Sequence, residues 1–396
     1  MRNSLIYFFG EGISRALALL SSLMMAYFLS PKDFGELAII FILAEICLIF
    51  VSNNAHAKAR VRYFKIDAKD FETMVVADLG NSILIAVAAF VIFIWIDAMS
   101  IMLKFFLLLA VLFRVPGQIM MVEKQCTKSA KNYVKLNLTF ALVNFLSLSL
   151  FVTYGVGTSS WVFAYLVASI SQYALVVTWD KKYNLVKGLK SGFNKLEFSG
   201  GLMYLPMAIS WSSKIAVERY TISYAVGLEA LGTYAFAYQM ASVVVILAQI
   251  LNIALYPEIA SRLKARVLPI NIILLAIPVL ILAATLVFFA TKWLLFSSEF
   301  SKFSNSLEYL ALMLASASVQ GMALIVFNII YILDRERNAV MIIIGIFSLQ
   351  PILYLVLFSA SIVTTYSVVL VSFFVVVGLL FVSSFRSVHL MKKYCG

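Results

Sequence analysis

Basic side chains lie inside apolar segments of this sequence, where a charge is costly. Arg114 stands near the middle of the apolar run 101–122, and no acidic residue is close to it in the chain. Even on the scale from insertion experiments, a cation at the centre of a bilayer costs roughly 2.5–3.5 kcal/mol. Arg15, Lys214 and Arg219 occupy similar runs. Cations kept at this cost predict a site that holds something negative inside a membrane.

Two of these cations have an acidic residue one helical turn away. Glu11 precedes Arg15, and Glu218 follows Lys214, so each pair can neutralise itself. The first pair either only lowers the cost of insertion or also faces a water-filled cavity. Arg219 lies about 100° around its helix from Glu218 and adds a net positive charge on another face.

Arg114 has two interpretations. It forms an interhelical pair with Glu45 or Asp78, or it faces a cavity without a counter-ion. The second is favoured, because Pro116 would bend the helix and free a carbonyl beside it. Glu45 is then either a counter-ion or a proton or sodium site. Lys104 lies near the outer end of its span and is expected to reach the interface.

The composition excludes a soluble domain. Hydrophobic residues make up 63% of the chain and charged residues 13%, whereas soluble domains carry about 25% charge. The net charge of +12 does not indicate nucleic acid, because Lys and Arg lie between apolar runs. The cysteine and histidine spacing predicts no metal site, and no catalytic set or Gly-rich phosphate loop is found. We therefore expect neither an enzyme, such as a membrane-embedded transferase, nor a cofactor.

The apolar runs predict twelve membrane-spanning helices, since about 20 residues cross a bilayer. They are expected at 5–29, 35–54, 74–96, 101–122, 134–154, 159–179, 200–225, 230–257, 267–291, 305–333, 339–359 and 363–385. With both termini cytoplasmic, only Lys32, Lys292 and Lys302 of the 31 basic residues fall in outside loops. This asymmetry supports the span count and the orientation.

The two halves of the chain share a local pattern. Residues 29–38 and 226–235 each follow a long span, turn at a glycine (Gly35 and Gly232) and begin the next span. The glycines are about half the chain apart, which favours a parallel repeat over a chance likeness of short turns. The expected domains are 1–179, a basic linker at 180–198 and 199–396. The linker can also lie on the anionic inner leaflet as an amphipathic helix.

These motifs resemble a known family. Residues 29–37 (Leu-Ser-Pro-Lys-Asp-Phe-Gly-Glu-Leu) follow an Arg-bearing first span, as in the polysaccharide transporters of the O-antigen (Wzx-type) flippase kind. The second half adds Leu205-Pro206, Glu218-Arg219, Gly227, Gly232, Tyr234, Tyr238 and Tyr256-Pro257-Glu258. The family usually has Asp-Arg where this chain has Glu218-Arg219. The superfamily also contains multidrug antiporters and lipid II flippases.

The resemblance implies two six-helix lobes around a central cavity that opens alternately to each side of the bacterial inner membrane. The implied substrate is undecaprenyl pyrophosphate carrying one oligosaccharide repeat unit. Arg15, Arg114, Lys214 and Arg219 would bind its pyrophosphate, with Glu11, Glu45, Asp78 and Glu218 as coupling groups or counter-ions. A proton or sodium gradient is the expected energy source. Membrane lipid, a polysaccharide polymerase and chain-length proteins are the candidate partners.

A cation-coupled multidrug antiporter of the same fold is the alternative. Its cavity should be rich in acidic and aromatic side chains that suit cationic drugs. Away from the span ends, cations here match or outnumber acids, which favours an anionic substrate.

Overall fold

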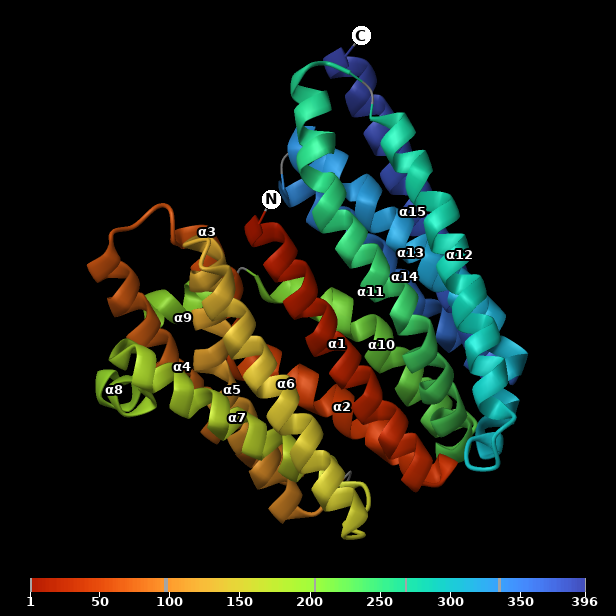
Figure 1. The fold of residues 1–396 in the computed structure, drawn as a ribbon, viewed down its shortest axis with the longest axis horizontal. Coiled ribbons are helices and arrows are strands. Elements are labelled where there is room, and N and C mark those ends of the chain that lie inside the picture. The colour runs from red at the N-terminus through yellow and green to blue at the C-terminus, as the bar shows by residue number, and fades with distance from the viewer. Residues whose placement is uncertain (1, 96–98, 203, 268, 334–335, 396) are drawn as a thin grey trace. The chain divides into compact units, whose positions relative to one another are not determined.

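The structure, a computed structural model, describes residues 2–95, 99–202, 204–267, 269–333 and 336–395 (Figure 1). Within these residues the secondary structure is helical, without strands, which confirms the predicted all-α class. The long helices are α1 (Arg2–Phe28), α2 (Pro31–Val51), α4 (Ala68–Ile94), α5 (Ile101–Cys126), α6 (Ala130–Thr153), α7 (Ser159–Trp179), α10 (Leu205–Ala225), α11 (Leu228–Lys264), α12 (Ile270–Leu295), α13 (Leu307–Leu333), α14 (Glu336–Ser359) and α15 (Thr365–Cys395). The short ones are α3 (Ala55–Arg62), η1 (Lys181–Tyr183), α8 (Leu185–Ser191), α9 (Lys195–Leu202) and η2 (Ser301–Ser306).

Ten helices in the described part of the chain are long and apolar enough to cross a membrane. The two other long helices are α1, with 27 residues, and α10, with 21 residues, and both have the length that a span needs. They fall outside the apolar group because they carry the charges that the sequence singles out. With them the helices match the twelve predicted spans, although α10 starts at Leu205 rather than at residue 200.

Packing divides the chain into two compact units. The first comprises Met1–Phe28 and Ile40–Ser212, and the second comprises Leu29–Ile39 and Ser213–Gly396. The division falls inside α2 and α10, whereas the predicted domains 1–179 and 199–396 follow the order of spans. The first turns of α2 thus pack with the second unit, and the predicted linker 180–198 packs with the first.

Equivalent helices pair in both units. In the first unit α4 packs on α5, α5 on α7 and α6 on α7; in the second, α12 packs on α13, α13 on α15 and α14 on α15. These are the same pairs, six spans apart in the chain. Within the second unit the two repeat glycines meet. A Cβ on Gly35 would collide with the carbonyl of Leu228, and one on Gly232 with the carbonyl of Pro31. The contact is reciprocal, as a repeat predicts, and only glycine allows so close an approach.

The segment 180–198 forms η1, α8 and the start of α9, and it packs against α4 and α7 in the first unit (Figure 1). Asn81 and Asn194 fix it, since each bonds the backbone of the other through its side chain or main chain. The Tyr183 hydroxyl donates to Glu123, to which Lys182 Nζ also bonds at 2.9 Å. Burial and the neighbouring Glu123 carboxylate raise the pKa of Tyr183 well above its usual value, so it remains a donor. The segment is therefore anchored by specific polar contacts.

Candidate functional site

Arg114 is a half-buried cation on α5 without an acidic partner. Its Nη1 donates to Oε1 of Gln172 on α7, and its guanidinium carbon lies 3.5 Å from the centre of the Phe140 ring on α6. Among the described residues no carboxylate forms an ion pair with it. An amide oxygen and an aromatic face stabilise the charge without neutralising it. Arg114 therefore keeps a net positive charge within its span.

Gln172 holds this arrangement in place. Its side chain is fully buried, and its Nε2 donates to the carbonyl of Leu136 at 3.1 Å. Because the amide nitrogen is committed there, the oxygen must point toward Arg114. Gly117 makes room for it, since a Cβ at that position would collide with Gln172 Oε1. Neither the glutamine nor the glycine was distinguishable from other span residues in the sequence.

Arg15 and Glu11 form the expected pair on α1, with Nε and Oε1 3.0 Å apart. The other oxygen of Glu11 accepts from the hydroxyl of Tyr133 at 3.0 Å and from Nδ2 of Asn137 at 2.9 Å. Glu11 thus joins α1 to α6. The Arg15 side chain remains about half exposed within this unit. Its charge is balanced, which distinguishes it from Arg114.

The two acidic residues considered as partners of Arg114 lie elsewhere, so that pairing is wrong. Glu45 is exposed and accepts from Ser212 Oγ at 2.9 Å. Asp78 is 3% exposed and forms an ion pair with Lys58 of α3. The sequence gave Lys58 the role of a topology-determining loop cation, and therefore missed that it competes for this carboxylate.

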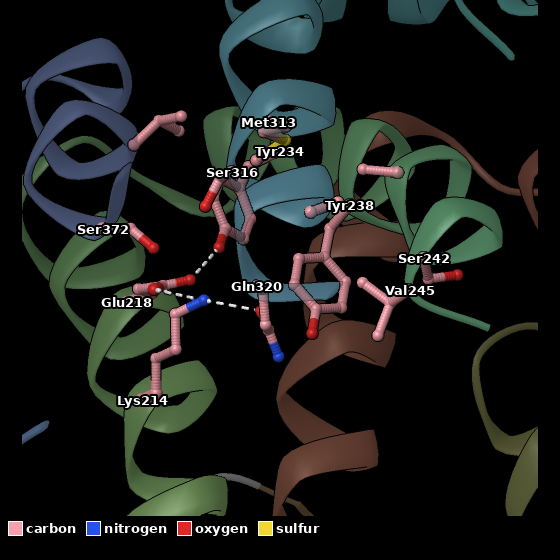
Figure 2. Close-up of a pocket in the computed structure, with 13 residues that line it drawn as sticks. Lys214, Glu218, Tyr234, Tyr238, Ser242, Val245, Met313, Ser316, Gln320 and Ser372 are labelled. Carbon is pink, nitrogen blue, oxygen red and sulfur yellow. Dashed lines mark hydrogen bonds and ion pairs between the residues drawn. The ribbon is translucent and has the colours of Figure 1, made fainter. Parts of the chain in front are cut away.

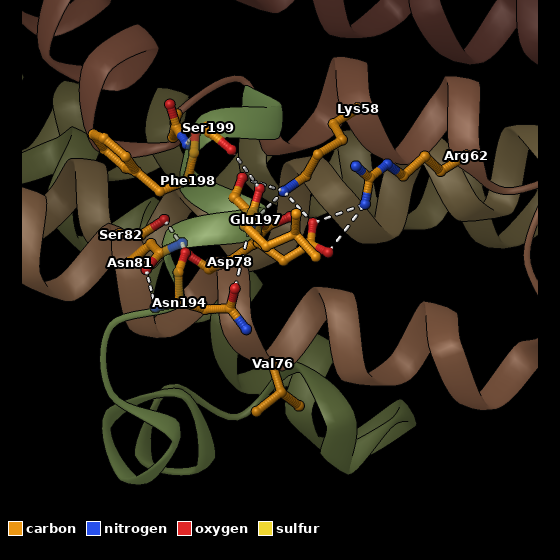
Figure 3. A network of polar contacts seen from close by, with 12 residues as sticks. Lys58, Arg62, Val76, Asp78, Asn81, Ser82, Asn194, Glu197, Phe198 and Ser199 are labelled. Carbon is orange, nitrogen blue, oxygen red and sulfur yellow. Dashed lines mark hydrogen bonds and ion pairs between the residues drawn. The ribbon is translucent and has the colours of Figure 1, made fainter. Parts of the chain in front are cut away.

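Lys58 is the centre of a connector network, defined as Lys58, Arg62, Asp78 and Glu197 (Figure 3). Its Nζ reaches Asp78 and also bonds Glu197 Oε2 at 2.9 Å. Arg62 Nη1 lies 3.0 Å from both oxygens of Glu197. The two cations and two carboxylates balance, and Lys58 is only 1% exposed. The network ties α9 to α3 and α4, so these charges serve the fold.

The second unit contains a pocket of about 420 Å³, measured to its open mouth, beside α10 (Figure 2). It is lined by Lys214, Glu218, Tyr234, Tyr238, Ala241, Ser242, Val245, Met313, Ser316, Ala317, Gln320, Val369 and Ser372. Lys214 Nζ lies 3.3 Å from Gln320 Oε1 and 4.0 Å from Glu218 Oε1. This α10 pocket therefore contains the predicted i,i+4 pair.

Glu218 is fixed more firmly than Lys214. It accepts from the hydroxyl of Tyr234 and, at 2.8 Å, from Nε2 of Gln350. The same Gln350 nitrogen reaches the hydroxyl of Tyr354, which donates to the carbonyl of Val368. A carboxylate that accepts on both oxygens is held in its ionised form. Glu218 is thus a structural anion that balances Lys214.

Arg219 lies next to the pocket but does not line it. It is 5% exposed, its Nη1 donates to the carbonyl of Ala38 at 2.7 Å, and its guanidinium lies 5.4 Å from the centre of the Tyr238 ring. Its buried Nε has no hydrogen-bond partner in the described structure. Like Arg114, it combines a carbonyl-type acceptor with an aromatic face. The structure therefore places Lys214 and Glu218 together and gives Arg219 a separate environment.

Sequence comparison identifies the family. The family model for a polysaccharide biosynthesis protein matches residues 24–267 of the 396. The chain belongs to this polysaccharide biosynthesis family. No curated protein sequence matches it.

This polysaccharide biosynthesis protein is also similar in fold to solved transporters. An inward-facing multidrug resistance MATE family transporter of the MOP superfamily gives a TM-score of 0.75 at 12% identity, with 96% of each chain covered. An outward-facing one gives 0.66 at 12% identity, covering 99% of this chain and 95% of the other. A MOP superfamily transporter from Pyrococcus furiosus gives 0.61 at 13% identity, covering 100% and 96%. These likenesses confirm the two-lobe fold of a membrane transporter.

Lys104 departs from its expected position in this family member. Its side chain is 3% exposed, and Nζ approaches the carbonyl of Ile94 at the end of α4 at 3.5 Å. The last carbonyls of a helix lack helical partners and attract cations. Lys104 thus caps α4 rather than extending into solvent, and it is unsuitable as a neutral control for mutation.

Proposed function

We propose that this protein is a flippase that moves undecaprenyl-pyrophosphate-linked repeat units of O-antigen or a related polysaccharide across the bacterial inner membrane. The observation that carries the proposal is the uncompensated cation of Arg114. A charge held in a span without an acidic partner is best explained by an anionic ligand that completes it. Membership of a polysaccharide biosynthesis family and the transporter fold support the same conclusion.

Arg114 is suited to a pyrophosphate. A guanidinium presents five donors in a planar fork that matches phosphate oxygens. Nη1 is committed to Gln172, which leaves donors for a ligand. We propose Arg219 as a second phosphate-binding residue in its own unit, with Arg15 contributing less because Glu11 balances it. The sugar chain would travel with the pyrophosphate while the lipid tail remains in the bilayer.

Glu45 is the proposed coupling group. It is exposed, and its bond to Ser212 is the only printed-length contact under 3 Å that commits it. A carboxylate so placed can take up a proton or sodium ion. If Glu45→Gln leaves both transport and its dependence on pH and sodium unchanged, Glu45 is not the coupling group.

The test of function uses a strain that lacks the gene. Lipid-linked repeat units should accumulate on the cytoplasmic face, and the wild-type gene should restore surface polysaccharide. Accumulation would also place the protein before the polymerase and the chain-length proteins. Normal surface polysaccharide in the deletion strain, together with increased sensitivity to cationic drugs, would instead support the multidrug antiporter.

Orientation is tested separately. We propose that both termini and the segment 180–198 face the cytoplasm. Reporter fusions after residues 157 and 300 should therefore report the outside. A cytoplasmic report from either fusion would contradict this orientation.

A further inference from the structure

We propose that the α10 pocket binds a neutral sugar residue of the substrate, apart from the cations that bind the pyrophosphate. The inference rests on the proposed function and assigns the saccharide part of that substrate to a site. It follows from polar groups that converge on the pocket without being used by the fold.

Two hydroxyls in the pocket are unused. Ser316 on α13 and Ser372 on α15 are 8% and 5% exposed, and neither has a hydrogen-bond partner among the described residues. Other span serines bond to the backbone of their own helix, as Ser318 Oγ does to the carbonyl of Leu314 at 2.9 Å. A buried hydroxyl left without a partner is costly. Hydroxyls that face a pocket can instead bond a ligand.

Lys214 and Gln320 add further donors to the same pocket. The Lys214 ammonium has three protons, and its hydrogen-bonding contact is the 3.3 Å one to Gln320 Oε1. The amide nitrogen of Gln320 has no partner in the described part of the chain. Figure 2 shows the polar ends of Lys214, Gln320 and Ser372 directed toward the same space. These groups offer both donors and acceptors, as the hydroxyls of a sugar require.

The charge balance favours a neutral ligand over a phosphate. Glu218 stays ionised because two donors hold it, and it lies 4.0 Å from Lys214. The pair therefore contributes no net charge at a distance, whereas Arg114 does. Tyr238 and the apolar residues Ala241, Val245 and Ala317 provide walls against which the C–H face of a sugar ring can pack. The volume of about 420 Å³ is within the usual range for small-ligand sites.

The test compares two lipids bound to the purified full-length protein in lipid nanodiscs. One is undecaprenyl pyrophosphate, and the other is the lipid-linked repeat unit extracted from cells that lack the gene. Ser316→Ala combined with Ser372→Ala should weaken binding of the repeat unit about tenfold, because two hydrogen bonds are lost. Binding of undecaprenyl pyrophosphate should not change. Ser318→Ala is the matched control, since its hydroxyl is committed to its own helix.

A second variant keeps the test decisive if the serines prove silent. Ala317→Phe places a ring in the pocket and should abolish the preference for the repeat unit while the melting temperature and undecaprenyl pyrophosphate binding are retained. Equal loss of both lipids, or no loss with either variant, would overturn the saccharide site. Wild-type protein that binds neither lipid would instead overturn the proposed function.

Discussion

Lys58 and Arg114 are both cations of the first unit, yet their surroundings differ completely. Lys58 contacts two carboxylates, from α4 and α9, and is 1% exposed. Arg114 contacts an amide oxygen and a phenyl ring. The first charge is used within the fold, and the second is left for something outside it. The comparison shows that a cation indicates function through what does not surround it, rather than through its depth in the sequence.

Lys214 lies between these two cases. It has one carboxylate at 4.0 Å, but that carboxylate is held by two other donors. Its charge is balanced while its protons remain available. The three cations therefore form a series from structural, through ligand-orienting, to charge-binding.

The largest expected effect is on stability, at Lys58. Lys58→Met should lower the free energy of unfolding by about 3–5 kcal/mol, because it leaves buried carboxylates unpaired. Thermal unfolding in detergent measures this. Adding Asp78→Leu should restore part of the loss, since one of the two stranded charges is then removed. A single variant as stable as wild type would remove the distinction between Lys58 and Arg114.

Arg114 should show the opposite behaviour. Arg114→Ala should reduce transport about 100-fold, from two lost charge-assisted bonds, with little change in unfolding temperature. Arg114→Lys should keep part of the activity, because the charge remains and the planar fork does not. Surface polysaccharide in the complemented deletion strain measures transport, and membrane protein level is measured in parallel. Lys131→Ala, an exposed cation on α6, is the matched control. Loss of transport that merely follows loss of folded protein would make Arg114 structural.

The stability of the Lys58 region should also depend on pH through His56 on the same helix. Burial, and then the positive charge of Arg60, lower the pKa of His56 from 6.5 to about 4. The unfolded chain therefore takes up a proton first, and stability falls as the pH drops from 6.5 toward 4. The loss should be about 2 kcal/mol at pH 4.5. His56→Gln should flatten this part of the profile, and an unchanged profile would exclude His56 as its source.

The smallest effect concerns the partner of Arg114. Gln172→Leu removes the acceptor but not the charge, so transport should fall roughly fivefold, corresponding to about 1 kcal/mol. The same variant frees the carbonyl of Leu136, and its melting temperature serves as the control. A loss as large as that of Arg114→Ala would mean that the amide itself contacts the substrate.

The sequence predicts the helices well because bilayer length and loop charge are local properties. The alternation that placed Lys58 and Arg62 in loops was useful for the span count, but it could not show that Glu197 lies beside them after folding. Pairs one turn apart, such as Glu11 with Arg15, were predicted correctly because helical geometry alone decides them. Arg114 was correctly identified as unusual. Its partners Gln172 and Phe140 come from other helices, and apolar periodicity carries no information about which helices meet.

The reciprocal glycine contact is an intermediate case. The equal spacing of Gly35 and Gly232 in the two halves suggested a repeat. Only the fold shows that each glycine lies against the backbone of the other repeat's helix. The same applies to Ser316 and Ser372, since a serine in a span gives no sign of whether its hydroxyl is already bonded.

The central claim, that Arg114 holds its charge for a pyrophosphate, is tested most directly by binding. Undecaprenyl pyrophosphate is titrated onto wild type, Arg114→Ala, Arg114→Lys and Lys131→Ala in nanodiscs of neutral lipid. We expect Arg114→Ala to bind about 100-fold more weakly, Arg114→Lys to lie between, and Lys131→Ala to match wild type. Wild-type affinity in Arg114→Ala would contradict the account.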